Sequence, residues 1–105
     1  MSITRNQSGE TLVLSLEGRL DTSAALELQE ELVPGFDKVK HIRLDFKRLV
    51  YVSSAGLRAL LLGEKAAKAA GGKMTIANVS TEIKDIFEMT GFSYVLTIEE
   101  TDAEL

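Results

Sequence analysis

The sequence predicts one α/β domain, over residues 1–105, with a mixed, mostly parallel sheet of about five strands and helices packed against it. Three observations predict this. The 105-residue length suits a single domain. Apolar residues alternate in short runs, as in half-buried strands, and recur at helical spacing between those runs. After an opening pair of strands the two patterns take turns, in the order β-β-α-β-α-β-α-β, which favours parallel strands joined by right-handed crossovers.

The first third of the chain predicts a hairpin and a helix. `SITRNQ` and `ETLVLSLEG` read as two strands joined at Ser8-Gly9, and the second strand alternates leucine with other residues. Asp21, Thr22 and Ser23 are suitable N-cap residues for the next helix, and Pro34-Gly35 closes it. The predicted buried face of that helix consists of Ala25, Leu28 and Leu32.

The middle of the chain predicts a strand and a longer helix. `HIRLDF` alternates as a strand, and a short basic loop, `KRL`, separates it from the apolar `VYV`. A helix follows over residues 54–70, and Gly71-Gly72 ends it. Helical spacing predicts a sheet-packing arc of Ala59, Leu62, Gly63, Ala66 and Ala70. It predicts an opposite, charged arc of Arg58, Glu64, Lys65 and Lys68.

Two leucines fall among those charges. Leu57, in the first turn, is interpreted as an edge-of-core residue, whereas Leu61 is the candidate for an exposed apolar contact. The remainder predicts a strand, `KMTIANV`, a helix opened by Ser80, `STEIKDIFEMTG`, and a last strand, `YVLTIEE`. The final `TDAEL` is an acidic tail or the start of a short last helix.

Composition argues against several functions. The net charge of −4 and pI near 5.0 argue against direct nucleic-acid binding, which needs a basic surface. Without cysteine there is no disulfide or cysteine-based zinc site, and no other metal or cofactor site is expected. No signal peptide or membrane-spanning run is apparent, so we expect a cytoplasmic protein with no direct membrane contact.

A catalytic serine would need a base. His41 is the only histidine, and it lies far in sequence from Ser53 and Ser54, so a small serine hydrolase requires folding to bring them together. Gly72-Lys73 lacks the spacing of a phosphate loop. We therefore expect a protein that is not an enzyme, and keep the hydrolase as the less favoured alternative.

The serine pair in `YVSSAGLRALLL` stands where a strand gives way to a helix. One interpretation is that a serine caps the helix and does nothing else. The other is that a phosphate on Ser53 or Ser54 lies beside the free N–H groups of the first turn and adds close to two negative charges to a docking surface. Gly56 would keep that turn slim enough for another protein's backbone to approach.

With these segments in view, the chain resembles the STAS family, specifically the anti-sigma factor antagonists of bacteria. The resemblance covers nearly the whole length. It rests on `VLSLEGRLDTSAALELQEEL`, on `HIRLDFKRLVYVSSAGLRALL`, and on `MTIANV` with `IFEMTGF`.

The resemblance implies a protein that binds an anti-sigma factor and thereby frees a sigma factor. In that family the anti-sigma factor is often a serine kinase, and a PP2C-type phosphatase reverses the phosphorylation. The family motif D-S-[S/T]-G-L, anchored on Gly56-Leu57, assigns Ser54 as phosphoacceptor, with Ser53 the alternative. Ser53 stands where the family has Asp, and Ala55 where it has Ser or Thr. The implied partner surface comprises Asp21, Ser53, Gly56, Leu57, Arg58 and Leu61.

One alternative keeps the STAS domain but gives it a different function. A STAS domain could be the accessory subunit of a membrane transport complex, such as a lipid-trafficking ABC system. Its stable partner would be a transporter ATPase, and phosphorylation would be unnecessary.

Overall fold

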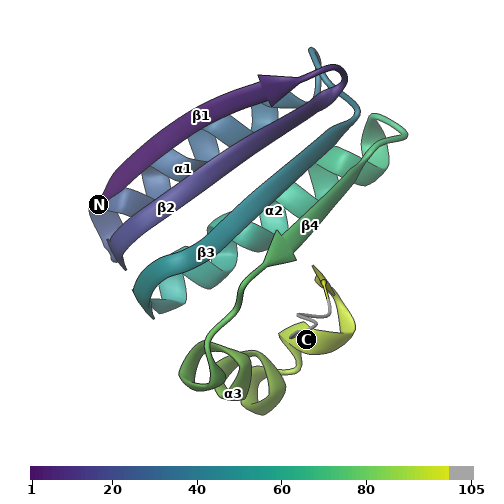
Figure 1. Cartoon of the computed structure of the whole chain (residues 1–105). Coiled ribbons are helices and arrows are strands. Elements are labelled where there is room, and N and C mark those ends of the chain that lie inside the picture. The colour runs from purple at the N-terminus through teal and green to yellow at the C-terminus, as the bar shows by residue number, and fades with distance from the viewer. Residues whose placement is uncertain (100–105) are drawn as a thin grey trace, which may run out of the picture.

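A computed structural model describes residues 1–99, and a five-stranded sheet in the order β1-β2-β3-β4-β5 forms its centre (Figure 1). The strands are β1 (Ser2–Ser8), β2 (Thr11–Leu20), β3 (His41–Val52), β4 (Lys73–Ala77) and β5 (Thr97–Ile98). The strand β1 pairs with β2 in antiparallel fashion, and every later pair is parallel. The mixed, mostly parallel sheet predicted from the sequence is confirmed.

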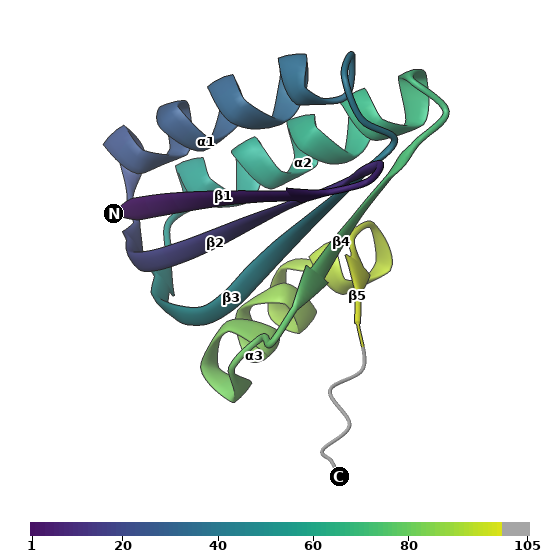
Figure 2. The ribbon, with the colours of Figure 1, turned by 45° about the horizontal axis from the view of Figure 1, so that its top comes forward.

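Two helices cover one face of this sheet. The helical elements are α1 (Thr22–Gly35), α2 (Ser54–Ala69), α3 (Thr81–Thr90) and the 3-10 helix η1 (Phe92–Tyr94). The helices α1 and α2 run side by side, behind the sheet in Figure 1 and above it in Figure 2, while the opposite face of β1, β2 and β3 carries no helix within the described residues. None of the helices in residues 1–99 is both long and apolar enough to cross a membrane.

Strand alternation forms the core between the sheet and the two helices. Leu14, Ile42 and Leu44 are fully buried, and the residues that alternate with them within each strand are partly exposed. Gly63 lets α2 approach closely, since a Cβ there would lie 2.7 Å from Leu32 Cδ1 and 2.9 Å from Met74 Sδ. At this point α2 therefore packs closely against both its neighbour α1 and the strand β4 beneath it.

Hydrogen-bonding caps begin the helices at the predicted places. The Asp21 side chain accepts a hydrogen bond from the Ala24 N–H at 3.0 Å, and Ser80 Oγ accepts one from the Ile83 N–H at 3.2 Å. Gly71, with φ of +72°, follows the end of α2, where the left-handed region favours glycine. Local sequence signals therefore determine where these helices begin and end.

The prediction of a loop at `KRL` is wrong. Residues 41–52 form one continuous strand, and β3 carries an extra residue relative to β2 at two places, between Ser15 and Glu17 and between Gly18 and Arg19. Each bulge interrupts the alternation of exposed and buried side chains. Lys47 and Arg48 are consequently both exposed. Two consecutive charged residues resemble a loop in the sequence, although they belong to the strand.

The predicted buried face of α2 is rotated in the structure. Leu62, Ala66 and Ala70 of the expected arc are only partly buried. The buried residues of the helix are Gly56, Leu57, Ala59, Leu60, Gly63, Glu64 and Ala67. Glu64 was expected among the exposed charges, so its burial corrects that prediction. The helix lies over β3 and β4 and beside α1, and this packing selects a different arc from the one with the smallest side chains.

The carboxyl-terminal part departs from the predicted strand. Tyr94 belongs to η1 and Val95 follows it, so only Thr97–Ile98 pairs with β4. The helix α3 reaches the core through Phe87, whose ring centroid lies 6.4 Å from that of Phe46. The predicted acidic tail or final short helix lies outside the described residues.

Candidate functional site, the first turn of α2

The helices α1 and α2 begin at the same edge of the sheet. The parallel strands β2 and β3 precede them, and Leu20 stands in register with Val52 at the ends of those strands. Both helices therefore begin side by side, with Asp21 exposed at one N-cap and Ser53 at the other. The unpaired N–H groups and positive dipole ends of two helices share this edge.

Ser53 has a structural role at this edge. Its backbone N–H and its hydroxyl both donate hydrogen bonds to the Leu20 carbonyl, at 2.9 Å each. The same hydroxyl accepts a hydrogen bond from the Gly56 N–H at 3.0 Å. The side chain thus caps α2 and ties it to the end of β2, and the hydroxyl is half-buried by these contacts.

Ser54 differs from its neighbour. It is the first residue of α2, its side chain is exposed, and its hydroxyl makes no hydrogen bond with any other part of residues 1–99. Of the two serines, Ser54 is therefore the one whose hydroxyl is exposed and has no partner among the described residues. Local sequence reasoning left the two alternatives open, because both residues are serine and either could cap the helix.

Gly56 and Leu57 are packed inside the molecule. A Cβ on Gly56 would lie 2.8 Å from Leu20 Cγ and 3.0 Å from the Leu20 carbonyl oxygen. The space beside Gly56 is therefore filled by Leu20 of the same chain, and is not open to another protein's backbone as the sequence interpretation expected. Leu57 is 9% exposed and belongs to the core cluster, in agreement with its interpretation as an edge-of-core residue.

The outer side of α2 continues from Ser54 along the helix. At about 100° per residue, Arg58, Leu61 and Lys65 lie close to the direction of Ser54. Arg58 and Lys65 are exposed, and Leu61 is half-buried. Of the partner-binding residues expected from the sequence, Asp21 and Arg58 are therefore exposed, Ser53 and Leu61 half-buried, and Gly56 and Leu57 buried.

Sequence reasoning missed an exposed apolar pair beside this edge. Val50 is 70% exposed and Tyr51 is 36% exposed, at the second bulge of β3. The guanidinium carbon of Arg19 lies 4.1 Å from the centroid of the Tyr51 ring, a cation–π contact across β2 and β3. The signal was present in `LVYV`, where the apolar run is too long for strict alternation.

The structure contradicts the serine hydrolase alternative. His41 begins β3 and Ser53 follows its end, and the 12-residue strand separates them by more than about 30 Å at the usual rise per residue. The His41 ring is instead bonded to Thr75 Oγ1, with Nε2 at 2.8 Å, and its Nδ1 lies 3.4 Å from Thr11 Oγ1. His41 is therefore too far away to act as a general base for Ser53 or Ser54.

The polar groups around His41 form a paired network on the helix-free face. The Arg43 guanidinium donates to both carboxylate oxygens of Glu99 at 2.9 to 3.1 Å. That contact lowers the pKa of Glu99 and raises the pKa of Arg43. Burial, and next the positive charge of Lys73, lower the pKa of His41. This cluster stabilises the neutral imidazole and the ion pair.

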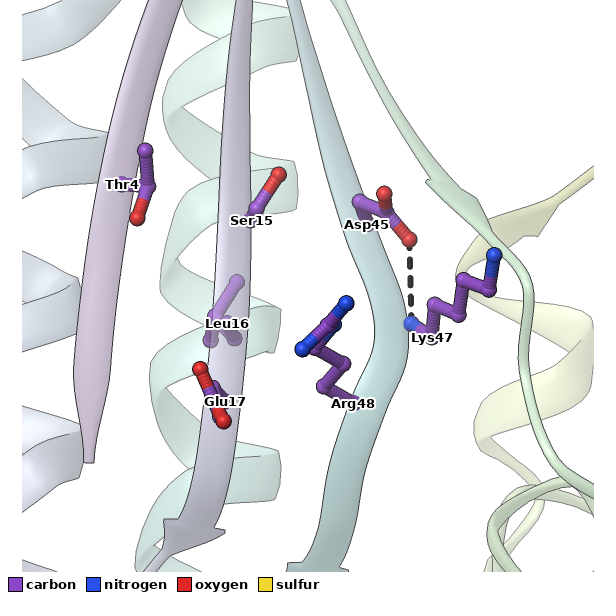
Figure 3. Close-up of a pocket in the computed structure, with 7 residues that line it drawn as sticks. All are labelled: Thr4, Ser15, Leu16, Glu17, Asp45, Lys47 and Arg48. Atoms are coloured by element: carbon purple, nitrogen blue, oxygen red, sulfur yellow. Dashed lines mark hydrogen bonds between the residues drawn. The ribbon is translucent and has the colours of Figure 1, made fainter.

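A shallow pocket of about 260 Å³ lies on the same face, between β1, β2 and β3 (Figure 3). Its charged residues are of both signs, Glu17 and Asp45 with Lys47 and Arg48. Asp45 is already engaged by the Lys47 N–H at 3.0 Å and by the Asn78 amide at 2.9 Å. Within residues 1–99 no group of acidic or histidine side chains has the arrangement of a metal site.

Comparison with known proteins relates this geometry to a family. The family profile described as the STAS domain matches residues 2–105. The Bordetella bronchiseptica protein BtrV, named as a candidate anti-sigma factor antagonist, is 30% identical over 93% of this chain and 85% of its own length. The anti-sigma-B factor antagonist of Bacillus subtilis is 26% identical over 93% of this chain and 90% of its own.

Solved structures share the fold. Unphosphorylated SpoIIAA, an anti-sigma factor antagonist, superposes with a TM-score of 0.78 at 21% identity, over 98% of this chain and 92% of its own. SpoIIAA of Bacillus in its phosphorylated form gives a TM-score of 0.75 at 22% identity, over 94% and 92% of the two chains. The sheet order and helix placement described above are thus those of a known domain.

Proposed function

The chain belongs to the STAS-domain family, and on that premise we propose that it is an anti-sigma factor antagonist. It binds an anti-sigma factor and thereby releases a sigma factor to direct transcription. The proposal is supported by relatives that carry this name and that match the chain over nearly all of its length. As a regulator of transcription it would act in the cytoplasm, by binding and not by catalysis.

We further propose that phosphorylation of Ser54 switches this binding off. The observation that carries this proposal is the difference between the two serines. The Ser53 hydroxyl is used in capping α2, whereas the Ser54 hydroxyl, at the first position of the helix, is exposed and makes no hydrogen bond within residues 1–99. A kinase can reach Ser54 without disrupting the fold. The phosphorylated form of the SpoIIAA structure is a precedent in a protein of the same fold.

Charge and desolvation indicate whether phosphorylation of Ser54 would strengthen or weaken binding of the partner. A phosphate adds about 1.5 to 2 negative charges at neutral pH, and the free N–H groups of the first turn of α2 stabilise it there. The exposed cap residue Asp21 already carries negative charge at the same edge. A partner that docks over this edge would have to desolvate the phosphate or accept its repulsion, so phosphorylation weakens docking.

The proposed partners are an anti-sigma factor that is also a serine kinase, and a PP2C-type phosphatase that removes the phosphate. The docking surface comprises Asp21, the β3–α2 junction with Ser53, and the first turns of α2 with Arg58 and Leu61. Gly56 and Leu57 contribute by shaping that turn from within.

The test uses the full chain and the anti-sigma factor kinase encoded beside its gene. The two proteins are incubated with ATP, the modified residue is mapped by mass spectrometry, and binding is measured by calorimetry. We expect phosphate on Ser54, loss of phosphorylation in Ser54→Ala, and at least tenfold weaker binding of Ser54→Asp. Phosphate on Ser53, or equal binding by Ser54→Asp, would contradict the switch while leaving the antagonist role standing.

Co-purification separates the transport alternative. If the tagged chain retrieves a transporter ATPase and not an anti-sigma factor, the antagonist role is wrong. Retrieval of a kinase-like anti-sigma factor would exclude the accessory-subunit role.

A further inference from the structure

The two helices that cover the sheet carry opposite charges on their outer surfaces. Every charged residue of α1 is acidic, namely Glu27, Glu30 and Glu31. The exposed charges of α2 are all basic, namely Arg58, Lys65 and Lys68. In a chain of net charge −4, the helix that bears Ser54 is therefore locally cationic.

Burial of Glu64 produces this cationic surface. Glu64 is the one acidic residue of α2, and it is only 7% exposed. Its Oε1 is buried without a hydrogen-bond partner within residues 1–99, and its Oε2 lies 3.9 Å from Lys68 Nζ. Because the carboxylate is turned inward, it does not neutralise the outer side of the helix at Lys65.

Two of the three cations on the outer side, Arg58 and Lys65, have no ionic partner within the described residues, whereas Lys68 lies 3.9 Å from Glu64. The acidic α1 pairs its Glu31 with Arg5 of β1. The adjacent carboxylates of α1 form no ion pair with α2 either. Within residues 1–99, the unpaired Arg58 and Lys65 beside the half-buried Leu61 have the character of an interface rim around an apolar contact.

From these observations we infer that the outer side of α2, defined by Arg58, Leu61, Lys65 and Lys68, binds an acidic surface of the anti-sigma factor. The inference rests on the proposed function and adds the chemistry of the partner. Complementary charge steers association and selects among partners more than it adds affinity. It also explains why a phosphate on Ser54 would act as an off switch, because an acidic partner surface would meet a like charge at the start of α2.

Matched charge reversals on the two helices test this inference. Lys65→Glu and Glu30→Lys each reverse one exposed charge in the middle of a helix, on α2 and α1 respectively. Binding of the full-chain variants to the anti-sigma factor kinase is measured at low and high NaCl, after circular dichroism confirms folding. We expect Lys65→Glu to bind about tenfold more weakly, mainly through slower association, and Lys65→Arg to bind as the unmodified chain does. Glu30→Lys should change affinity less than about twofold.

Salt provides a second readout. Binding of the unmodified chain should weaken as NaCl rises, and Lys65→Glu should lose most of that dependence, because exposed charges are screened over about 8 Å at physiological salt. If Lys65→Glu and Glu30→Lys shift affinity equally, or if neither does while the unmodified chain still binds, the inference is wrong and the antagonist role stands. If the unmodified chain does not bind at all, both fall together.

A second copy of the chain is the competing occupant, because an acidic helix beside a basic one could pair with itself. Sedimentation at increasing concentration distinguishes the two. A dimer that Lys65→Glu breaks, and that mixing with Glu30→Lys restores, would overturn the inference. A monomer whose α2 variants lose only partner binding supports it.

Discussion

The polar side chains near the start of β3 are hydrogen-bonded to one another, whereas some of those where β3 leads into α2 are not. At the start of the strand the polar groups bond to one another, His41 to Thr75 and Arg43 to Glu99. At the other end, Ser53 is bonded to the fold, but the adjacent Ser54 and Arg58 are left without partners in residues 1–99. Polar groups that are paired internally contribute to stability, whereas exposed groups without partners are free for modification and binding.

The largest expected effect tests whether the β3–α2 junction is as tightly packed as its glycine contact indicates. In Gly56→Val, a branched Cβ would meet the side chain and carbonyl of Leu20 at 3.0 Å or less. We expect a loss of about 3 kcal/mol in the free energy of unfolding, measured by urea titration. Ala69→Val, on the exposed side of the same helix, is the control and should cost less than about 1 kcal/mol. Similar losses in both variants would contradict the close packing.

The contrast between the two serines is sharpened by separate alanine substitutions. Ser53→Ala removes the cap of Gly56 N–H and the bond to the Leu20 carbonyl, and should cost about 1–2 kcal/mol. Ser54→Ala removes an exposed hydroxyl and should stay within about 0.5 kcal/mol of the unmodified chain. The same urea titration measures both. Equal destabilisation would mean that Ser54 is also a structural residue.

The paired end of β3 is tested through its ion pair. Glu99→Gln leaves the side chain in place but removes the charge that Arg43 binds. Because both side chains are about a third exposed or more, we expect a loss of only about 0.5 kcal/mol at neutral pH. As the pH falls below about 4.5 and then through the lowered pKa of folded Glu99, this contribution is lost, so the difference between the two proteins should shrink. A difference that grows on acidification would contradict this role.

The smallest expected effect concerns His41. Its pKa is lowered in the folded protein, first by burial and then by Lys73, so the unfolded chain takes up a proton first as the pH falls below about 6.5. This group's contribution is therefore fully present above that pH and decreases as the pH falls toward the folded pKa. Comparison of urea midpoints at pH 7.5 and 5.5 should show a smaller decrease in His41→Asn than in the unmodified chain. An unchanged pH dependence in the variant would contradict the assignment.

Most of the fold could be predicted because its signals are local. Alternating leucines identified β2, and the caps Asp21 and Ser80 identified the starts of α1 and α3. The errors arose where a distant segment decides the outcome. The two bulges of β3 appear only in register with β2, and the buried arc of α2 depends on its place beside α1 and β4.

The sequence by itself determined the order of the elements, the mixed sheet and the serine pair at the start of a helix, because spacing and residue type are sufficient for these. Only the tertiary structure distinguishes the surroundings of the two hydroxyls, since Ser53 donates its hydrogen bond to the carbonyl of Leu20, 33 positions earlier in the chain, and Ser54 does not. It also turned Glu64 inward and left the outer side of α2 basic. Both outcomes depend on contacts between segments that are distant in the sequence, and the spacing of residues along the chain does not specify such contacts.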